Sequence, residues 1–212
     1  AACGTPPLAA DPGTDTPEPV LDAAVAAAWP LEPGATWRYQ VRVEEPVGNE
    51  VSKEIVTEQV AAVGQQDAAT VVTVDRWNST QTSRLFYAIL GNALYQTPAG
   101  MEVAAAQQLL ATLGRGQNRW QPEYIFPLEV GAAFGAMGTP TPDHGYEWFV
   151  EAQEAVRVPA GRLEDCFRLV LRTNSGEALR WFCPGVGLAR ARYGFQGNRH
   201  VEEWELVSYP GQ

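Results

Sequence analysis

The titratable residues of this 212-residue chain show no catalytic pattern. Asp143 and His144 could supply a general base or a metal ligand, because imidazole titrates near neutral pH. They lie, however, in a loop with two prolines, which is typical of a solvated turn. No phosphate-binding loop or nucleophile elbow is present. We therefore expect no catalytic residue, no metal and no cofactor, and we keep a hydrolase only as a remote alternative.

Aromatic residues are the strongest candidates for a binding site. Stacked on the concave face of a curved sheet, tryptophan rings could hold a sugar or an acyl chain. The alternative is that they form the core, where large aromatic rings are common. Five tryptophans lie on expected strands: Trp37, Trp77, Trp148, Trp181 and Trp204.

Two cysteines, Cys166 and Cys183, lie 17 residues apart on the two strands of an expected hairpin. With a three-residue loop over 174–176 the two side chains would point in opposite directions. With a bulge, or with a two-residue loop at Asn174 and Ser175, they would lie directly across from each other. The sequence leaves both registers open, so Cys166–Cys183 is a candidate disulfide.

The third cysteine, Cys3, follows two alanines and precedes a segment rich in Pro, Thr, Ala and Asp. Residues 4–18 cannot bury enough apolar surface to offset the entropy of ordering, so we expect a tether. Small residues before a cysteine, followed by a polar spacer, resemble the cleavage end of a bacterial lipoprotein signal peptide. That resemblance implies acylation of Cys3 and attachment to a membrane. The alternative is an incidental cysteine.

Charge narrows the classes of partner. The formal net charge is −10 and the sequence pI is about 4.7, which argues against a nucleic-acid-binding protein. Eight arginines nevertheless lie between residues 157 and 199. They could form a basic stripe, but Glu202, Glu203 and Glu205 on the following strand favour an ion-paired, solvated face.

The elements that would position these residues are mostly strands. From Thr36 to Glu44 every second residue is apolar, which is the period of a strand with one buried face. Apolar residues at helical spacing predict a helix at about 101–113 that packs on the sheet, and an alanine-rich segment predicts a short helix at 20–28. We expect the other strands at 53–63, 69–77, 84–90, 94–97, 146–158, 166–173, 179–183, 188–193 and 201–209.

An internal similarity indicates a duplication. The segment 29–37 (WPLEPGATW) recurs as 126–134 (FPLEVGAAF) at an offset of 97 residues. Weaker matches follow further along the chain, at offsets of 98 and 95 residues. Each proline excludes a central ladder position, so we expect the aromatic ring before it to anchor under the sheet. We expect residues 1–28 to hold the anchor, tether and short helix, and 29–212 to form one β-rich domain. Its repeats would span about 29–97 and 126–209, joined by a helix-containing linker at 98–125.

The segments FPLEVG, VPAG (158–161) and PGVGL (184–188) resemble a family of bacterial secreted lipoproteins of unassigned activity. The resemblance covers about residues 126–193. It implies a mainly β fold with an antiparallel, strongly curved sheet, similar to the open half-barrels of the lipoprotein carriers LolA and LolB. The motifs consist of turn glycines and prolines that precede strands, so they carry over no catalytic residue.

The sequence therefore predicts a non-enzymatic, lipid-anchored protein of the bacterial cell surface or periplasm. It would act by binding, or as an accessory subunit of a cell-surface assembly with protein partners. The alternative is a carrier of a small apolar or lipid ligand, which would need an apolar cavity between helix 101–113 and the sheet. No role in nucleic-acid binding is expected.

Overall fold

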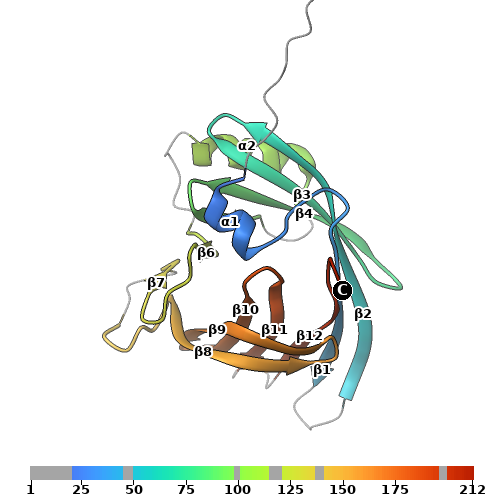
Figure 1. Ribbon diagram of the computed structural model, residues 1–212, viewed down its shortest axis with the longest axis vertical. Helices are drawn as coiled ribbons and strands as arrows, with labels where there is room; N and C mark the ends of the chain where they lie inside the picture. The colour runs from blue at the N-terminus through green and yellow to red at the C-terminus, as the bar shows by residue number, and fades with distance from the viewer. Residues whose placement is uncertain (1–20, 45–49, 98–100, 115–120, 137–140, 196–199) are drawn as a thin grey trace, which may run out of the picture.

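The computed structural model describes residues 21–44, 50–97, 101–114, 121–136, 141–195 and 200–212. Within them, antiparallel strands form one twelve-stranded sheet that curls into a nearly closed barrel (Figure 1). The expected fold class is confirmed. The strands are β1 (Thr36–Glu44), β2 (Glu50–Gln66), β3 (Ala69–Trp77), β4 (Thr82–Leu90), β5 (Ala93–Gln96), β6 (Tyr124–Ile125), β7 (Ala133–Phe134), β8 (Trp148–Val158), β9 (Gly161–Thr173), β10 (Gly176–Cys183), β11 (Gly187–Phe195) and β12 (His200–Ser208).

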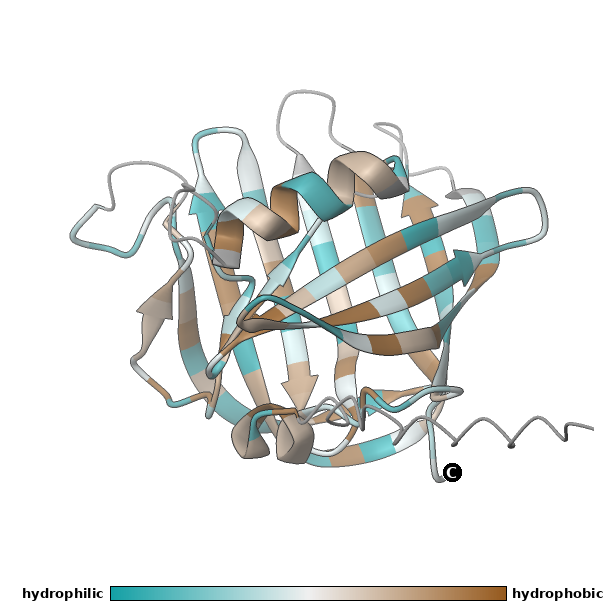
Figure 2. Ribbon diagram, turned by 90° about the horizontal axis from the view of Figure 1, so that it is seen from above, coloured by the Kyte–Doolittle hydropathy of each residue, from teal (hydrophilic) through white to brown (hydrophobic). Residues whose placement is uncertain are grey.

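The sheet consists of two meanders joined through their outer strands. Its order runs from β6 back to β1 and then from β12 back to β7, so β1 pairs with β12 and Val41 lies opposite Trp204. Alternation along β1 buries Trp37, Tyr39 and Val41 inside the barrel, as its period predicted. The bands of alternating hydropathy along the strands follow the same rule (Figure 2).

The two similar segments make the same backbone hydrogen bonds. Gly34 N donates to Val60 O over 2.8 Å, and Gly131 N donates to Val150 O over 2.9 Å. Both glycines have positive φ, 87° and 92°, a conformation that a side chain would strain. The duplication itself stays a prediction, but the two turns that lead into β1 and β7 are built alike.

One end of the barrel is closed by α1 (Ala23–Ala28) and the segment after it. Asp22 caps the helix, since its Oδ1 accepts a hydrogen bond from Ala24 N over 2.9 Å. Trp29 follows at 4% exposure, and its counterpart Phe126 is 1% exposed. Both rings are therefore the buried anchors that the repeated motif predicted.

The second helix, α2 (Val103–Gly114), packs on the outer face of the sheet. Its buried residues Ala106, Leu110 and Leu113 form a separate apolar cluster with Phe86 and Ala88 of β4. The packed helix is confirmed. The space in which a carrier was expected to hold its ligand is occupied by these side chains. Neither described helix is long and apolar enough to cross a membrane.

The hairpin of β9 and β10 resolves the question of the cysteines. Thr173 pairs with Gly176, so the loop has two residues and the cysteines face each other. Cys166 and Cys183 form a disulfide, with 4.1 Å between their Cα atoms.

Candidate functional site

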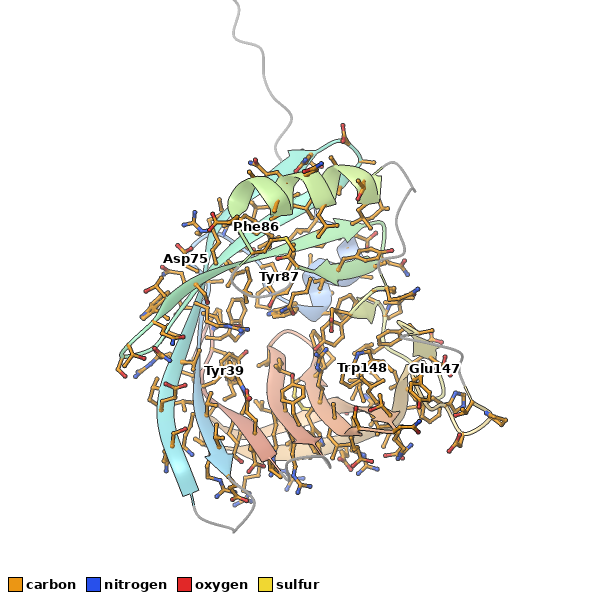
Figure 3. All side chains as sticks on the ribbon, turned by 180° about the vertical axis from the view of Figure 1, so that it is seen from behind. Tyr39, Asp75, Phe86, Tyr87, Glu147 and Trp148 are labelled. Carbon is orange, nitrogen blue, oxygen red and sulfur yellow. A yellow bond between two sulfur atoms is a disulfide. The ribbon has the colours of Figure 1, made fainter. Side chains whose placement is uncertain are left out.

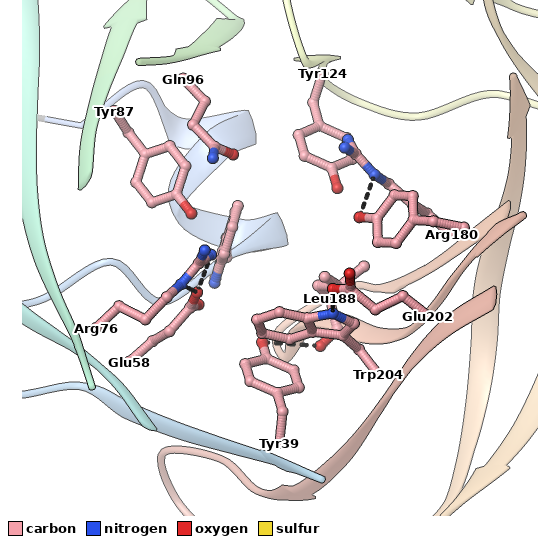
Figure 4. A pocket seen from close by; sticks show the side chains of 12 residues that line it. Tyr39, Glu58, Arg76, Tyr87, Gln96, Tyr124, Arg180, Leu188, Glu202 and Trp204 are labelled. Atoms are coloured by element: carbon pink, nitrogen blue, oxygen red, sulfur yellow. Dashed lines mark hydrogen bonds and ion pairs between the residues drawn. The ribbon is translucent and has the colours of Figure 1, made fainter. Parts of the chain in front are cut away.

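The interior of the barrel holds a cavity of about 190 Å³, which we call the central cavity (Figure 4). Strands of both meanders contribute to it, because the pairing of β1 with β12 brings the chain's two halves together. Its lining combines aromatic rings with charged and amide groups. The lining residues are Trp29, Tyr39, Glu58, Arg76, Tyr87, Gln96, Tyr124, Arg180, Leu188, Tyr193, Glu202 and Trp204.

On one wall, Arg76 of β3 is paired with Glu58 of β2. Arg76 Nε donates to Glu58 Oε1 over 2.7 Å, and the Glu58 side chain is only 7% exposed. The guanidinium lies over the ring of Trp204, 5.1 Å from its centroid. Burial alone would lower the pKa of Arg76, but the adjacent Glu58 carboxylate and the hydroxyls of Tyr87 and Tyr39 together raise it. Arg76 is therefore charged, and it is paired with the Glu58 carboxylate.

The other wall repeats this arrangement. Arg180 Nη1 of β10 donates to Glu123 Oε2 over 2.6 Å, and Arg180 Nε donates to the hydroxyl of Tyr193 over 3.3 Å. Its guanidinium lies 4.2 Å from the ring centroid of Trp148 and 5.7 Å from that of Tyr124. Burial opposes the charge, yet Tyr193, Tyr124 and Glu123 hold the pKa of Arg180 well above its usual value. This arginine is also charged, neutralised by a carboxylate and packed between rings.

Neutral phenols line the rest of the cavity. Burial raises the pKa values of Tyr39, Tyr87 and Tyr124, so all three remain protonated donors. Tyr39 donates to Leu188 O over 3.1 Å. The hydroxyl of Tyr87 has no hydrogen-bond partner among the described residues, so it is available to a ligand.

Trp29 forms the floor of the central cavity. Its ring centroid lies 5.4 Å from that of Tyr87 and 5.5 Å from that of Phe182. A Cβ at Gly187 would overlap the indole of Trp29, so only glycine leaves room for this ring. That Nε1 is buried and makes no hydrogen bond within the described part of the chain.

Two further cavities adjoin the central one. The first, about 340 Å³, lies beside the β3–β4 turn and shares Arg76 and Trp204 with the central cavity. The second, about 300 Å³, lies beside the β9–β10 turn and shares Arg180 and Tyr193 with it. We call them the β3–β4 cavity and the β9–β10 cavity. Each arginine thus lies at a junction between two cavities.

The structure divides the five candidate tryptophans. Trp204 lines the central cavity, Trp148 the β9–β10 cavity and Trp77 the β3–β4 cavity. Trp37 is a core residue instead, 1% exposed, and its Nε1 donates to Val186 O over 2.7 Å. Trp181 lies on the outer face, where its Nε1 donates to Glu154 over 2.8 Å.

The loop with Asp143 and His144 does not reach these cavities. His144 Nδ1 lies 2.8 Å from Glu147 Oε1, and its ring stacks on Phe149 at 4.1 Å. Asp143 accepts a hydrogen bond from the hydroxyl of Thr141. Within the described ranges no three metal-ligating side chains come together.

Several arginines of the carboxyl half form ion pairs on the outer face. Arg190 pairs with Glu203 across β11 and β12, and Arg168 and Arg172 both pair with Glu151 of β8. A uniformly basic stripe is therefore absent from the described part of this face. The candidate lipidation residue Cys3 lies outside the described residues.

The sequence analysis missed Glu58, Arg76 and Arg180. A signal was present in their strand positions. Glu58 shares the inward phase of β2 with the buried Val56 and Val60, and Arg76 shares that of β3 with Val74. A charge in the apolar phase of a strand indicates a buried, paired group.

No protein-family model matches the chain, and no curated protein matches its sequence. Among solved structures it is similar to a candidate exported protein with a YmcC-like fold from Bacteroides fragilis, with 11% identity and a TM-score of 0.47. That match covers 84% of this chain and 96% of the other. A candidate lipoprotein from Parabacteroides distasonis is similar at 13% identity and a TM-score of 0.46, over 85% and 97% of the two chains. Similarity of this degree assigns neither a family nor a function.

Proposed function

We propose that this protein is a non-enzymatic, lipid-anchored extracytoplasmic protein that binds a small, uncharged ligand with a polar ring in the central cavity. The observation that carries the proposal is the pairing of each interior arginine with a carboxylate and a tryptophan ring. Such a lining offers flat apolar surfaces and many hydrogen-bonding groups without an unpaired cation, and its further carboxylate, Glu202, accepts a hydrogen bond from Trp204 Nε1. It suits a ring with polar substituents better than an anion.

The same pairing supports binding over catalysis and over lipid transport. Glu58 and Glu123 are held by arginines, and Glu202 accepts a hydrogen bond from Trp204 Nε1, so each of these carboxylates already has a partner. An acyl chain in the cavity would cover two ion pairs and several hydroxyls without hydrogen-bonding to them, which is unfavourable.

A role as an accessory subunit has less support. Docking to a protein partner needs a continuous apolar patch or a free strand edge. The large apolar side chains exposed on the described residues are Ile55 of β2, Ile125 of β6 and Val130 of the turn before β7. The two terminal strands, β6 and β7, have only two residues each.

Export and anchoring are supported by the cysteines. The Cys166–Cys183 disulfide suits an oxidising compartment, and acylation of Cys3 would supply the anchor. Mass spectrometry of the protein from its native membrane should find acyl mass on the amino-terminal peptide, and Cys3→Ser should release the protein into the soluble fraction. An unmodified Cys3 would contradict the anchor.

The binding proposal is tested by a screen with monosaccharides, nucleosides and aromatic amino acids, with palmitate as the acyl probe. Thermal shift and tryptophan fluorescence should detect an uncharged ring compound. Trp204→Ala should weaken its binding about tenfold, while the outer-face control Trp181→Ala should change the affinity less than about twofold. Binding of palmitate alone, lost in Trp204→Ala, would overturn the proposal in favour of a lipid carrier.

A further inference from the structure

The three cavities form a row, which we call the trough. The central cavity shares two side chains with the β3–β4 cavity and two others with the β9–β10 cavity, whereas the two outer cavities share none with each other. The row runs from the β3–β4 turn to the β9–β10 turn, with Arg76 and Trp204 between its first two cavities and Arg180 and Tyr193 between its last two. A compound confined to the central cavity would leave both ends empty.

Each cavity of the trough contains the same kinds of groups. Each is lined by at least one tryptophan: Trp77 and Trp204 in the β3–β4 cavity, Trp29 and Trp204 in the central cavity, and Trp148 in the β9–β10 cavity. Neutral hydrogen-bonding side chains accompany them at both ends, with Asn78, Gln81 and Ser83 in the β3–β4 cavity and Thr173 and Ser175 in the β9–β10 cavity. The chemistry is thus repeated along the row.

We infer that the trough binds a short, linear, uncharged saccharide chain, with one sugar ring in each cavity. This rests on the proposed function and extends it from a single ring to a chain. A pyranose ring has an apolar face of C–H groups, which packs against an aromatic ring, and an edge of hydroxyls, which hydrogen-bonds to amides, hydroxyls and paired charges. Arg76 and Arg180 lie at the two junctions, where each can donate to two neighbouring rings.

The charges of the trough disfavour an ionic polymer. Arg76 is neutralised by Glu58 and Arg180 by Glu123, and Glu54, Glu177 and Glu202 add further carboxylates. With a net charge of −10 on the chain, an acidic polymer would be repelled. No compensating basic cluster lines the described trough.

The position of the trough disfavours a peptide. Extended peptides are usually recognised by backbone pairing at a free strand edge. The trough is lined by the faces of strands whose backbone groups already pair with one another, as β3 does with β2 and β4. A peptide there would leave its own amides without partners, whereas a saccharide needs only side-chain contacts.

The test uses the full chain and linear oligomers of glucose and of N-acetylglucosamine, one to four units long, with α-1,4 and β-1,4 linkages. Isothermal calorimetry should show affinity rising about tenfold with each unit up to three for one of these series, with less than a twofold gain from the fourth. Blocked, uncharged tripeptides serve as the comparison class.

Two filling variants locate the chain in the trough. Ser83 and Ala178 project inward beside Arg76 and Tyr193, and each lines one outer cavity only. Ser83→Phe and Ala178→Phe should each weaken trisaccharide binding about tenfold and leave the monosaccharide affinity unchanged. If a filled variant does not fold, Trp77→Ala, which shortens the β3–β4 end instead, should cause the same selective loss, with Trp181→Ala as its control.

Equal affinity for one and three units, or filling variants that bind the trisaccharide normally, would overturn the inference while leaving the single-ring proposal standing. Length-dependent binding of the blocked tripeptides without any saccharide would overturn it in favour of a peptide. If no saccharide of any length binds, the inference fails, and the separate ring-compound screen decides the proposed function.

Discussion

The inner and outer faces of the barrel use the same residue types in different ways, and β3 shows the contrast between two adjacent residues. Asp75 points outward and pairs with Arg84 of β4, Oδ1 to Nε at 2.7 Å, with both side chains at least one-third exposed. Arg76 points inward and pairs with Glu58, whose side chain is 7% exposed (Figure 4). Figure 3 shows Asp75 on the outer side of the same strand. One pair stays in water, whereas the other was removed from it.

The next strand repeats the contrast with aromatic residues. Phe86 faces outward beneath α2 and is part of that helix's apolar cluster. Its neighbour Tyr87 faces inward, contacts Trp29 and presents a hydroxyl to the central cavity. The outer residue serves packing, while the inner one adds a polar atom. Interior polar groups cost free energy unless they have a use, so the comparison places function on the inner face.

The largest effect on stability should come from breaking the interior ion pair between Glu58 and Arg76. Glu58→Gln leaves Arg76, whose side chain is only 25% exposed, charged and without its partner, and should lower the free energy of unfolding by about 4 kcal/mol. Asp75→Asn, its matched control on the outer face, should cost less than about 1 kcal/mol because water replaces the lost contact. Urea denaturation of both variants at pH 7 measures the difference. Equal losses would show that the interior pair is as well solvated as the outer one.

The floor of the cavity should respond almost as strongly. Gly185, in the β10–β11 turn, and Gly187, the first residue of β11, both have positive φ, 73° and 96°. A Cβ at Gly185 meets open space, whereas one at Gly187 meets the indole of Trp29. Gly185→Ala should cost about 1 kcal/mol from backbone strain alone. Gly187→Ala should cost about 3 kcal/mol, because it also displaces a buried ring. Denaturant midpoints compare the two, and similar values would mean that Trp29 can move freely.

Local patterns predicted most of the fold. The period-2 strands, the helix at about 101–113 and the two buried anchors Trp29 and Phe126 all follow from residues close together in sequence. The register of the cysteine hairpin did not follow, since two- and three-residue loops both fit Asn174–Gly176. The strand pairing also gives a different offset between the repeats from the 98 residues of one sequence match. Val72 pairs with Tyr87 in β3 and β4, and Phe167 pairs with Phe182 in β9 and β10, so equivalent residues lie 95 positions apart.

The candidate site was predictable only in part because it depends on the closure of the barrel. Trp204 lies over Arg76, although 128 positions separate them, because β12 pairs with β1. No local pattern specifies that pairing. Three of five candidate tryptophans line the trough, while Trp181, which follows the inward Arg180, alternates to the outer face. The sequence showed which residues share one face of a strand, but it did not show which of the two faces lines a cavity.

The smallest of these effects is on the free energy of unfolding at alkaline pH, and it distinguishes Tyr87 from Phe86. Burial raises the pKa of Tyr87 above that of an unfolded tyrosine, about 10, so its contribution to stability is complete below pH 10 and is lost as the pH rises above it. At pH 11 one such phenol accounts for a loss of about 1.4 kcal/mol. Tyr87→Phe should therefore lose about 1.4 kcal/mol less than the wild type between pH 9 and pH 11. Phe86→Leu, on the outer face, should lower stability equally at both pH values. Urea titrations at pH 9 and pH 11 measure the change in the free energy of unfolding for the wild type and both variants. If Tyr87→Phe changes as much as the wild type, the hydroxyl of Tyr87 is open to water, and the central cavity is not a desolvated site.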